Sequence, residues 1–137
     1  MSNFEVIAAH YAASDRGDLA GMLAPLMPDT TWTEAAGFPY AGTYVGPEAV
    51  RRNVFEAIDA DWQGFRFTLS ELLDAGHAVV GVGTYQGTHR RSGRSFTARV
   101  AHVWTFTDGH LSSFEQIVDS APVRAAVDGD RPGAGAR

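Results

Sequence analysis

The chain has 137 residues, of which 45% are hydrophobic and 20% are charged, and this balance is typical of one globular domain with one core. Its formal net charge is −5, which argues against nucleic acid as a partner because phosphate contacts need a basic surface. The lack of cysteine excludes a disulfide framework and thiol catalysis, and no apolar run is long enough to span a bilayer, so we expect no membrane partner. Because the N-terminal residues lack the pattern of a signal peptide, we expect a cytoplasmic protein.

The N-terminal part of the sequence predicts two helices and a strand. Apolar residues recur with the spacing of an amphipathic helix over residues 3–15, at Phe4, Ile7, Ala8, Tyr11 and Ala12. A short helix is expected over 19–23, where two following prolines end it. A strand over 29–34 comes next, and because successive side chains of a strand point to opposite faces, Trp32 and Glu34 share one face.

The middle of the sequence predicts a loop, a helix and two strands. Residues 35–46 are rich in glycine, proline and tyrosine, which is typical of a loop. Pro47 at the first helical position, followed by an acidic residue in the first turn, predicts a helix over 47–57. Alternating apolar and polar residues then predict strands over 65–71 and 77–88.

A β-hairpin is predicted over residues 96–119. Asp108 and Gly109 lie between two runs of strand-forming residues, and a two-residue turn of this type needs the positive φ that glycine adopts freely. His102 and Gln116 lie within these strands among apolar residues. Because a buried polar group costs free energy unless it has a partner, we expect these side chains to bond to one another or to a ligand.

The order of the elements predicts the fold class. Two helices, a strand, a further helix and four strands indicate an α+β domain in which a curved antiparallel sheet wraps around helices. We expect this single domain to cover residues 1–127, with a short helix over 122–127 at its end. Residues 128–137 consist mainly of glycine, alanine and charged residues, and we expect them to be disordered.

Several short phrases of the sequence resemble those of one superfamily. They are Asp15 to Leu19, Asp29 to Glu34, Gly42 to Val50 and Trp104 to Leu111. Together and in this order, they resemble the NTF2-like superfamily, which includes SnoaL-like and ketosteroid-isomerase-like proteins, over residues 3–125. The resemblance implies a cone-shaped fold with an internal pocket between the helices and the concave sheet face. It also implies a homodimer through the outer sheet face, where we expect Ala101, Val103 and Ile117.

The resemblance points to two catalytic residues. Glu34 ends the predicted first strand and matches the position of the carboxylate base in ketosteroid isomerases, where the pocket must tune the pKa of the base. His102 lies near the position where those enzymes place a neutral acid that donates to the substrate oxygen, and a neutral imidazole can also donate. The alternatives are a glutamate at the rim that faces solvent and a strand histidine that bonds to a neighbour.

His10 is a candidate substrate-binding residue. It matches, by the resemblance, the helix position of the second oxyanion donor of the isomerases, which is a tyrosine. Tyr11 is adjacent but points about 100° away around a helix, so we expect the tyrosine donor to be missing or its role to have moved. The alternative for His10 is an exposed or capping histidine.

Gln116 is a second candidate for substrate binding. In SnoaL-like polyketide cyclases a catalytic aspartate matches this position, but glutamine can only form hydrogen bonds at neutral pH. If the hairpin has a simple two-residue turn, strict alternation places Glu115 rather than Gln116 on the same face as His102. A bulge in the last strand would return Gln116 to the pocket. We favour the bulge because the resemblance requires it.

Six aromatic residues are expected to line the pocket or to belong to the ordinary core: Trp32, Tyr40, Tyr44, Phe55, Trp104 and Phe114. The sequence does not place Tyr85 inside or outside. The five histidines include no pair at the spacing of metal ligands beside a carboxylate, and no glycine-rich phosphate loop precedes a helix. We therefore expect neither a metal nor a cofactor.

Three functions remain open from the sequence. The first is a cofactor-free enzyme, isomerase- or cyclase-like, on a hydrophobic carbonyl compound, in which Glu34 moves a proton and His102 stabilises the developing negative oxygen. The second is a non-catalytic binding protein for a small hydrophobic ligand, which His102 and Gln116 would orient. The third is a protein-interaction module that uses the outer sheet face. The fold alone does not decide between them, because this fold supports many activities.

Overall fold

The structure is a computed structural model, and it describes residues 1–129. Of the tail predicted over 128–137, residues 130–137 lie outside the described residues. The helical segments, in chain order, are α1 (Asn3–Asp15), α2 (Leu19–Leu23), α3 (Pro47–Val50), a π-helical turn (Arg51–Phe55), α4 (Glu56–Asp61) and α5 (Ser120–Val127). The strands are β1 (Leu26–Glu34), β2 (Gly42–Val45), β3 (Trp62–Asp74), β4 (Ala78–His89), β5 (Ser95–Thr107) and β6 (His110–Val118).

The six strands form one sheet in the order β2-β1-β6-β5-β4-β3. Neighbouring strands are antiparallel, except that β1 and β6 run parallel. The parallel pair arises because the chain crosses from β2 through α3 and α4 to the far edge of the sheet at β3, and then returns strand by strand to β1. The predicted α+β fold with a curved sheet around N-terminal helices is confirmed, and this parallel pair is the difference.

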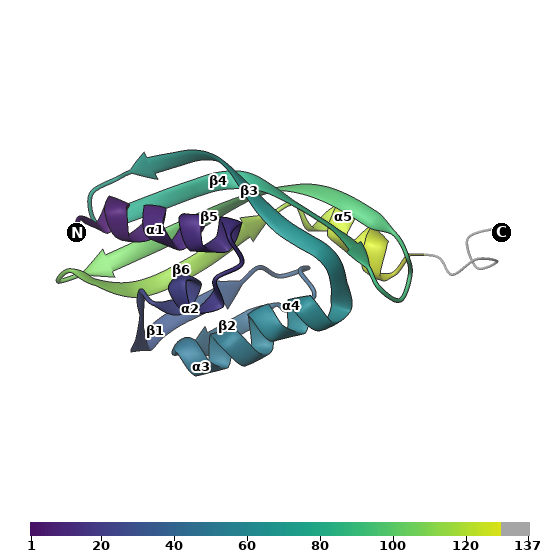
Figure 1. The fold of residues 1–137 in the computed structure, drawn as a ribbon, viewed down its shortest axis with the longest axis horizontal. Coiled ribbons are helices and arrows are strands. Elements are labelled where there is room, and N and C mark those ends of the chain that lie inside the picture. The colour runs from purple at the N-terminus through teal and green to yellow at the C-terminus, as the bar shows by residue number, and fades with distance from the viewer. Residues whose placement is uncertain (130–137) are drawn as a thin grey trace.

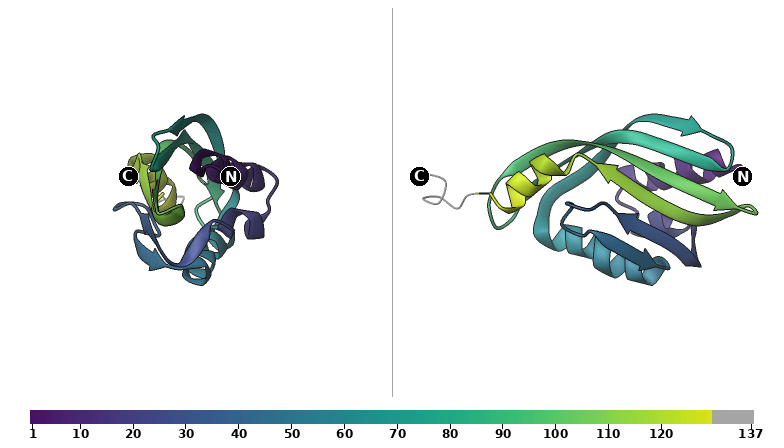
Figure 2. Two further views of the ribbon diagram at one scale, coloured as in Figure 1. Left: turned by 90° about the vertical axis from the view of Figure 1, so that its left-hand side faces the viewer. Right: turned by 180° about the vertical axis from the view of Figure 1, so that it is seen from behind.

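The helices cover the concave face of the sheet (Figure 1). Helix α1 packs against β3 and β4, whereas α3 packs against β1 and β2. When the molecule is viewed along its long axis, the sheet curves around these helices (Figure 2). Helix α5 packs against β5 and β4, at the end of the molecule opposite to the N-terminus. Within residues 1–129, none of the helices has the length and hydropathy of a membrane-crossing segment.

Side-chain caps fix the starts of the N-terminal helices. The Ser2 hydroxyl accepts a hydrogen bond from the backbone N–H of Glu5 at 3.0 Å, and the Glu5 carboxylate accepts one from the backbone N–H of Ser2 at 2.8 Å. This reciprocal pair is a capping box. Asp18 caps α2 through a single bond, since its carboxylate accepts from the backbone N–H of Gly21 in the first turn at 3.0 Å. The buried side of α1 carries His10 and Tyr11, which line the cavity described below.

The middle of the chain differs from the sequence-based prediction in its boundaries. The loop predicted over 35–46 contains β2, so the prediction of continuous loop is wrong for Gly42–Val45. Strand β2 is short and begins with glycine, and its sequence therefore gives almost no alternation to detect. The helix predicted over 47–57 continues through the π-helical turn to Asp61, and β3 begins directly after it.

The turn between β5 and β6 has the predicted form. Asp108 and Gly109 both have positive φ, at 50° and 77°, and such a pair matches the right-handed twist of the two strands. Glycine adopts this backbone region without steric cost, whereas a residue with a Cβ atom is disfavoured there. The hairpin predicted from this dipeptide is confirmed.

A bulge in β6 decides which polar residue faces the interior. The register of β5 and β6 shifts at Ser112, which has no partner residue in β5. Beyond the bulge, His102 pairs with Gln116, whose side chain is 2% exposed, whereas Glu115 is exposed to solvent. The bulge that the resemblance required is therefore present, and Gln116 rather than Glu115 lies on the same face as His102.

Candidate functional site

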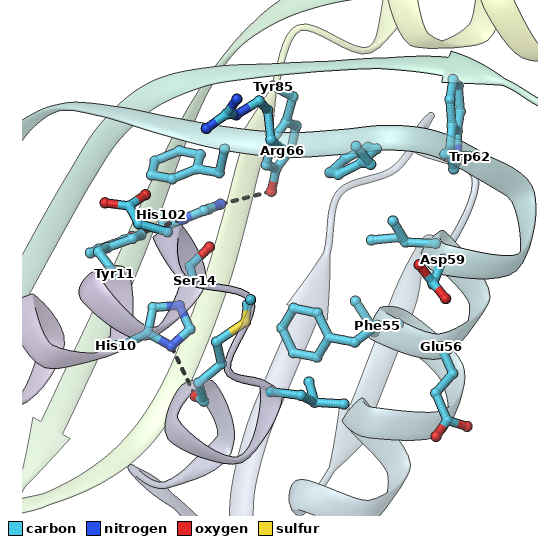
Figure 3. Close-up of a pocket in the computed structure, with 18 of the residues that line it drawn as sticks. His10, Tyr11, Ser14, Phe55, Glu56, Asp59, Trp62, Arg66, Tyr85 and His102 are labelled. Carbon is cyan, nitrogen blue, oxygen red and sulfur yellow. Dashed lines mark hydrogen bonds between the residues drawn. The ribbon is translucent and has the colours of Figure 1, made fainter.

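A cavity of about 960 Å³ opens between the helices and the concave face of the sheet. His10 and Tyr11 of α1, Tyr85 of β4 and His102 of β5 form one wall, and Phe55 lies across from them (Figure 3). The volume is in the range of natural ligand pockets. These residues come from four elements that are distant in sequence, so only the folded chain creates the cavity.

Glu34 is a buried carboxyl group on the wall of this cavity. Its side chain is 3% exposed, so the alternative of a solvent-facing rim glutamate does not describe the structure. Oε2 accepts a hydrogen bond from Trp32 Nε1 at 2.9 Å, and Oε1 accepts one from Gln116 Nε2 at 3.3 Å. Burial disfavours the charged form and raises the pKa of Glu34 to about 7, although both hydrogen bonds lower it. A carboxyl group of this kind exchanges a proton readily near neutral pH.

Gln116 holds Glu34 and Tyr85 in fixed positions. Its Oε1 atom accepts from the backbone N–H of Ala35 at 3.0 Å, which fixes the orientation of the amide. Nε2 then donates to Glu34 Oε1 and, at 3.0 Å, to the hydroxyl oxygen of Tyr85. One amide nitrogen thus links the buried carboxylate to the buried tyrosine. Gln116 does not line the cavity itself. The sequence led us to expect a contact between Gln116 and a ligand, but in the structure Gln116 contacts Glu34 and Tyr85, which both line the cavity.

His102 lies between two tyrosines. Its Nδ1 atom is 2.8 Å from the hydroxyl oxygen of Tyr11, and its Nε2 atom is 2.7 Å from that of Tyr85. The Tyr11 oxygen also accepts from Trp104 Nε1 at 2.9 Å. Burial lowers the pKa of His102 to about 3, with a smaller contribution from His10, so the ring is neutral at neutral pH. Both ring nitrogens therefore have protein partners, and neither is left for a direct hydrogen bond to a ligand.

Tyr11 and Tyr85 are the site residues that sequence reasoning did not assign. Around a helix, Tyr11 was expected to point away from His10, yet both side chains are buried and both line the cavity. Gly81, Gly83 and Tyr85 stand at every second position along β4, and all three are buried on the same face of the sheet. That pattern was the available signal, because glycines on a buried face leave room for large neighbouring rings.

His10 presents one free nitrogen to the cavity. Its Nδ1 atom lies 2.8 Å from the carbonyl oxygen of Met22, and since a carbonyl only accepts, Nδ1 carries the hydrogen (Figure 3). Burial lowers the pKa of His10 to about 4, so the ring is neutral and Nε2 has a lone pair. None of the residues in 1–129 bonds to that Nε2 atom, which can therefore accept a hydrogen bond from a ligand. Of the alternative, an exposed or capping histidine, exposure does not fit a buried side chain, whereas the bond to a carbonyl in the last turn of α2 is a capping contact.

The aromatic residues predicted for the pocket divide into two groups. Trp32, Phe55 and Phe114 line the cavity. Trp104 is fully buried behind it, and Tyr40 and Tyr44 do not line it. The Tyr40 hydroxyl donates to the Asp61 carboxylate at 2.7 Å and accepts from Trp62 Nε1 at 3.1 Å, and the Tyr44 hydroxyl donates to the carbonyl oxygen of Tyr40 at 2.7 Å. Tyr40 and Tyr44 therefore brace the segment beside the cavity.

Charged residues also line the cavity. Asp15 of α1, Glu56 and Asp59 of α4 and Arg66 of β3 are all exposed to solvent, and Figure 3 shows the last three. The interior by contrast is mostly aromatic. Among the described residues, no three histidine or acidic side chains lie close enough together to hold a metal ion. The chemistry that these residues offer is therefore acid–base chemistry by Glu34 and hydrogen bonding by the histidines and tyrosines.

An α+β domain whose curved sheet closes over helices and holds a cavity is characteristic of the NTF2-like class of folds. Residues 7–114 match the family model described as the SnoaL-like domain, and the chain belongs to this family. The chain is similar to an NTF2-like protein from Burkholderia thailandensis E264, with 48% identity, a TM-score of 0.90, and coverage of 93% of this chain and 98% of that one. An NTF2-like protein of unknown function from Burkholderia pseudomallei K96243 is 31% identical, with a TM-score of 0.82 and the same coverage.

A third similar structure contains a small molecule. TerC, co-crystallised with polyporic acid, is 29% identical to this chain, with a TM-score of 0.79, and the match covers 92% of this chain and 98% of TerC. The comparison with curated proteins gave no match. The family and the fold are thus established.

Proposed function

We propose that the protein is a cofactor-independent acid–base catalyst, isomerase- or cyclase-like, that acts on a hydrophobic carbonyl compound. Glu34 is the general base that removes a proton from the carbon beside the carbonyl group. A hydroxyl group of the Tyr11–His102–Tyr85 chain donates to the carbonyl oxygen as negative charge develops there. His102 is a positioning residue, because its own nitrogens are occupied by the two tyrosines.

The observation that carries this proposal is the state of Glu34. A general base works best when its pKa lies near the operating pH, and burial in the cavity wall raises the pKa of Glu34 to about 7. The mostly aromatic walls favour an apolar ligand. The co-crystallisation of the similar protein TerC with polyporic acid supports a small-molecule ligand for this chain.

The second candidate function is a non-catalytic binding protein for a hydrophobic metabolite. Gln116 favours it, because this residue stands where cyclases of the resemblance have an aspartate and it cannot transfer a proton. The two candidates share the cavity and the ligand class. They differ only in whether a proton moves.

Deuterium exchange tests the proposal directly. We expect the protein to accelerate exchange of the methyl hydrogens of 2-acetylnaphthalene in deuterated buffer, measured by proton NMR. The rate should rise with pH and level off above about 7, because only the ionised form of Glu34 removes a proton. Binding of the ketone without accelerated exchange would instead support the binding protein. A ketone that neither binds nor exchanges would contradict both.

We also propose a homodimer through the outer face of the sheet. Ala101 and Ile117 are opposite each other on β5 and β6, Val103 lies on the same face, and Ile117 is 52% exposed in the single chain. An apolar residue of this size gains stability when a second subunit covers it. Gel filtration over a range of concentrations is expected to give a dimer, and a monomer throughout would contradict it.

A further inference from the structure

The geometry points to Tyr85 as the residue that donates a hydrogen bond to the ligand oxygen, with His102 holding it through the Nε2–H tautomer. The inference deepens the proposed function and rests on it only for the nature of the ligand. It assigns the donor to β4, where sequence reasoning had placed no functional residue. It also excludes Tyr11 of α1, although Tyr11 bonds to the same imidazole.

The number of hydrogens around His102 limits which tyrosine can donate to a ligand. Burial raises the pKa values of Tyr11 and Tyr85, so both are neutral phenols, and neutral His102 carries one N–H. Three hydrogens are thus available for the two contacts of His102 with the tyrosines, and each contact needs one. One tyrosine hydrogen is left over. The imidazole tautomer decides which tyrosine hydrogen is free. With the hydrogen on Nδ1, His102 donates to Tyr11 and the Tyr11 hydrogen is free. With the hydrogen on Nε2, His102 donates to Tyr85 and the Tyr85 hydrogen is free.

The surroundings of Tyr11 leave no place for a ligand oxygen. Its hydroxyl oxygen lies 2.9 Å from Trp104 Nε1 and 2.8 Å from His102 Nδ1. On a further side is the backbone of Gly81, so close that a Cβ atom there would lie 2.3 Å from the same oxygen. A free hydrogen on Tyr11 would therefore have no acceptor. If Tyr11 donates to His102 Nδ1 instead, every polar atom around it is satisfied.

The surroundings of Tyr85 suit a donor to the ligand. Its hydroxyl oxygen accepts from Gln116 Nε2 at 3.0 Å and, in the Nε2–H tautomer, from His102 at 2.7 Å. Its own hydrogen is then free, and Tyr85 lines the cavity (Figure 3). The same Gln116 nitrogen bonds to Glu34 Oε1, so base and donor lie only two hydrogen bonds apart. A carbonyl oxygen at Tyr85 therefore places the adjacent carbon near Glu34, as proton removal requires.

Nitrogen NMR of the unliganded chain tests the tautomer. With ¹⁵N-labelled histidine, the His102 signals, identified by their loss in His102→Asn, are expected to report a hydrogen on Nε2 and a bare Nδ1. His10 is the internal reference for the opposite tautomer, since its Nδ1 faces a carbonyl oxygen. A hydrogen on Nδ1 of His102 would overturn the inference. This result does not depend on catalysis, so it can fail while the proposed function holds.

A bound ketone tests the donor. The carbonyl stretch of ¹³C=O-labelled 2-acetylnaphthalene is expected to fall on binding and to return toward its value in apolar solvent in Tyr85→Phe, with binding weakened roughly tenfold or less. The matched variant Tyr11→Phe should keep most of the shift. A shift lost in Tyr11→Phe and kept in Tyr85→Phe would overturn the inference, as would no shift in the native chain. Exchange that survives Glu34→Gln would refute the proposed function alone.

Discussion

Replacing Glu34 with glutamine is expected to lower the rate of proton exchange from bound 2-acetylnaphthalene by about 10²–10⁴-fold, the usual contribution of a positioned general base. Glutamine has the same shape but cannot accept a proton. The pH dependence near 7 should disappear together with the rate, because it belongs to the ionisation of this one carboxyl group. Exchange and its pH profile are measured by proton NMR, with binding measured separately by titration.

The same substitution is expected to change how stability depends on pH. The pKa of Glu34 is raised from 4.5 to about 7 in the folded chain, so the folded state binds the proton more tightly than the unfolded state. The stability of the native protein therefore falls as pH rises from 4.5 to about 7, where an ionised carboxylate is forced to stay buried. Glu34→Gln removes this loss.

The effect of Glu34→Gln on the free energy of unfolding is measured as a difference between two pH values. Between pH 5 and pH 8, Glu34→Gln should gain roughly 2 to 3 kcal/mol in free energy of unfolding relative to the native chain. The comparison cancels any fixed cost of placing the amide of residue 34 against the amide of Gln116. Urea unfolding at both pH values measures it. The control is Glu115→Gln on the exposed side of β6, for which no such difference is expected.

Local patterns in the sequence predicted the elements that carry the cavity. The Asp108–Gly109 dipeptide predicted the hairpin, and strand alternation predicted that Trp32 and Glu34 share a face. The structure bears out this second point, since Trp32 Nε1 donates to the Glu34 carboxylate. These predictions succeeded because backbone geometry and near neighbours determine them.

The remainder depends on contacts between distant residues. The bulge at Ser112 adds a residue to β6 without any local signal, and only the resemblance gave reason to expect it. Tyr11 and Tyr85 are distant in sequence, and nothing near either residue shows that His102 will lie between them. The raised pKa of Glu34 likewise arises from burial by several elements together. Sequence patterns therefore predicted the elements, the resemblance implied the cavity between them, and neither predicted which side chains would bond within it.

Trp104→Ala is expected to cost about 3–5 kcal/mol of stability, the usual range for removing a fully buried aromatic side chain. Trp104 is 0% exposed, and its ring centroid lies 4.6 Å from that of His10, 4.7 Å from that of Phe114 and 5.6 Å from that of Trp32. Alanine would leave a void among these rings, and since they line the main cavity, they have no second layer to collapse onto. Urea unfolding at pH 7 measures the loss.

Trp104→Phe separates the ring from its hydrogen bond. Phenylalanine keeps much of the apolar volume, but it leaves the Tyr11 oxygen without the N–H that now lies 2.9 Å away. We expect a cost of about 1–3 kcal/mol, because a buried acceptor loses its donor and some packing is lost as well. We assign most of the stability at the back of the cavity to packing of the Trp104 ring. If Trp104→Ala were no less stable than Trp104→Phe, that stability would come from the hydrogen bond to Tyr11 instead, and the assignment would be wrong.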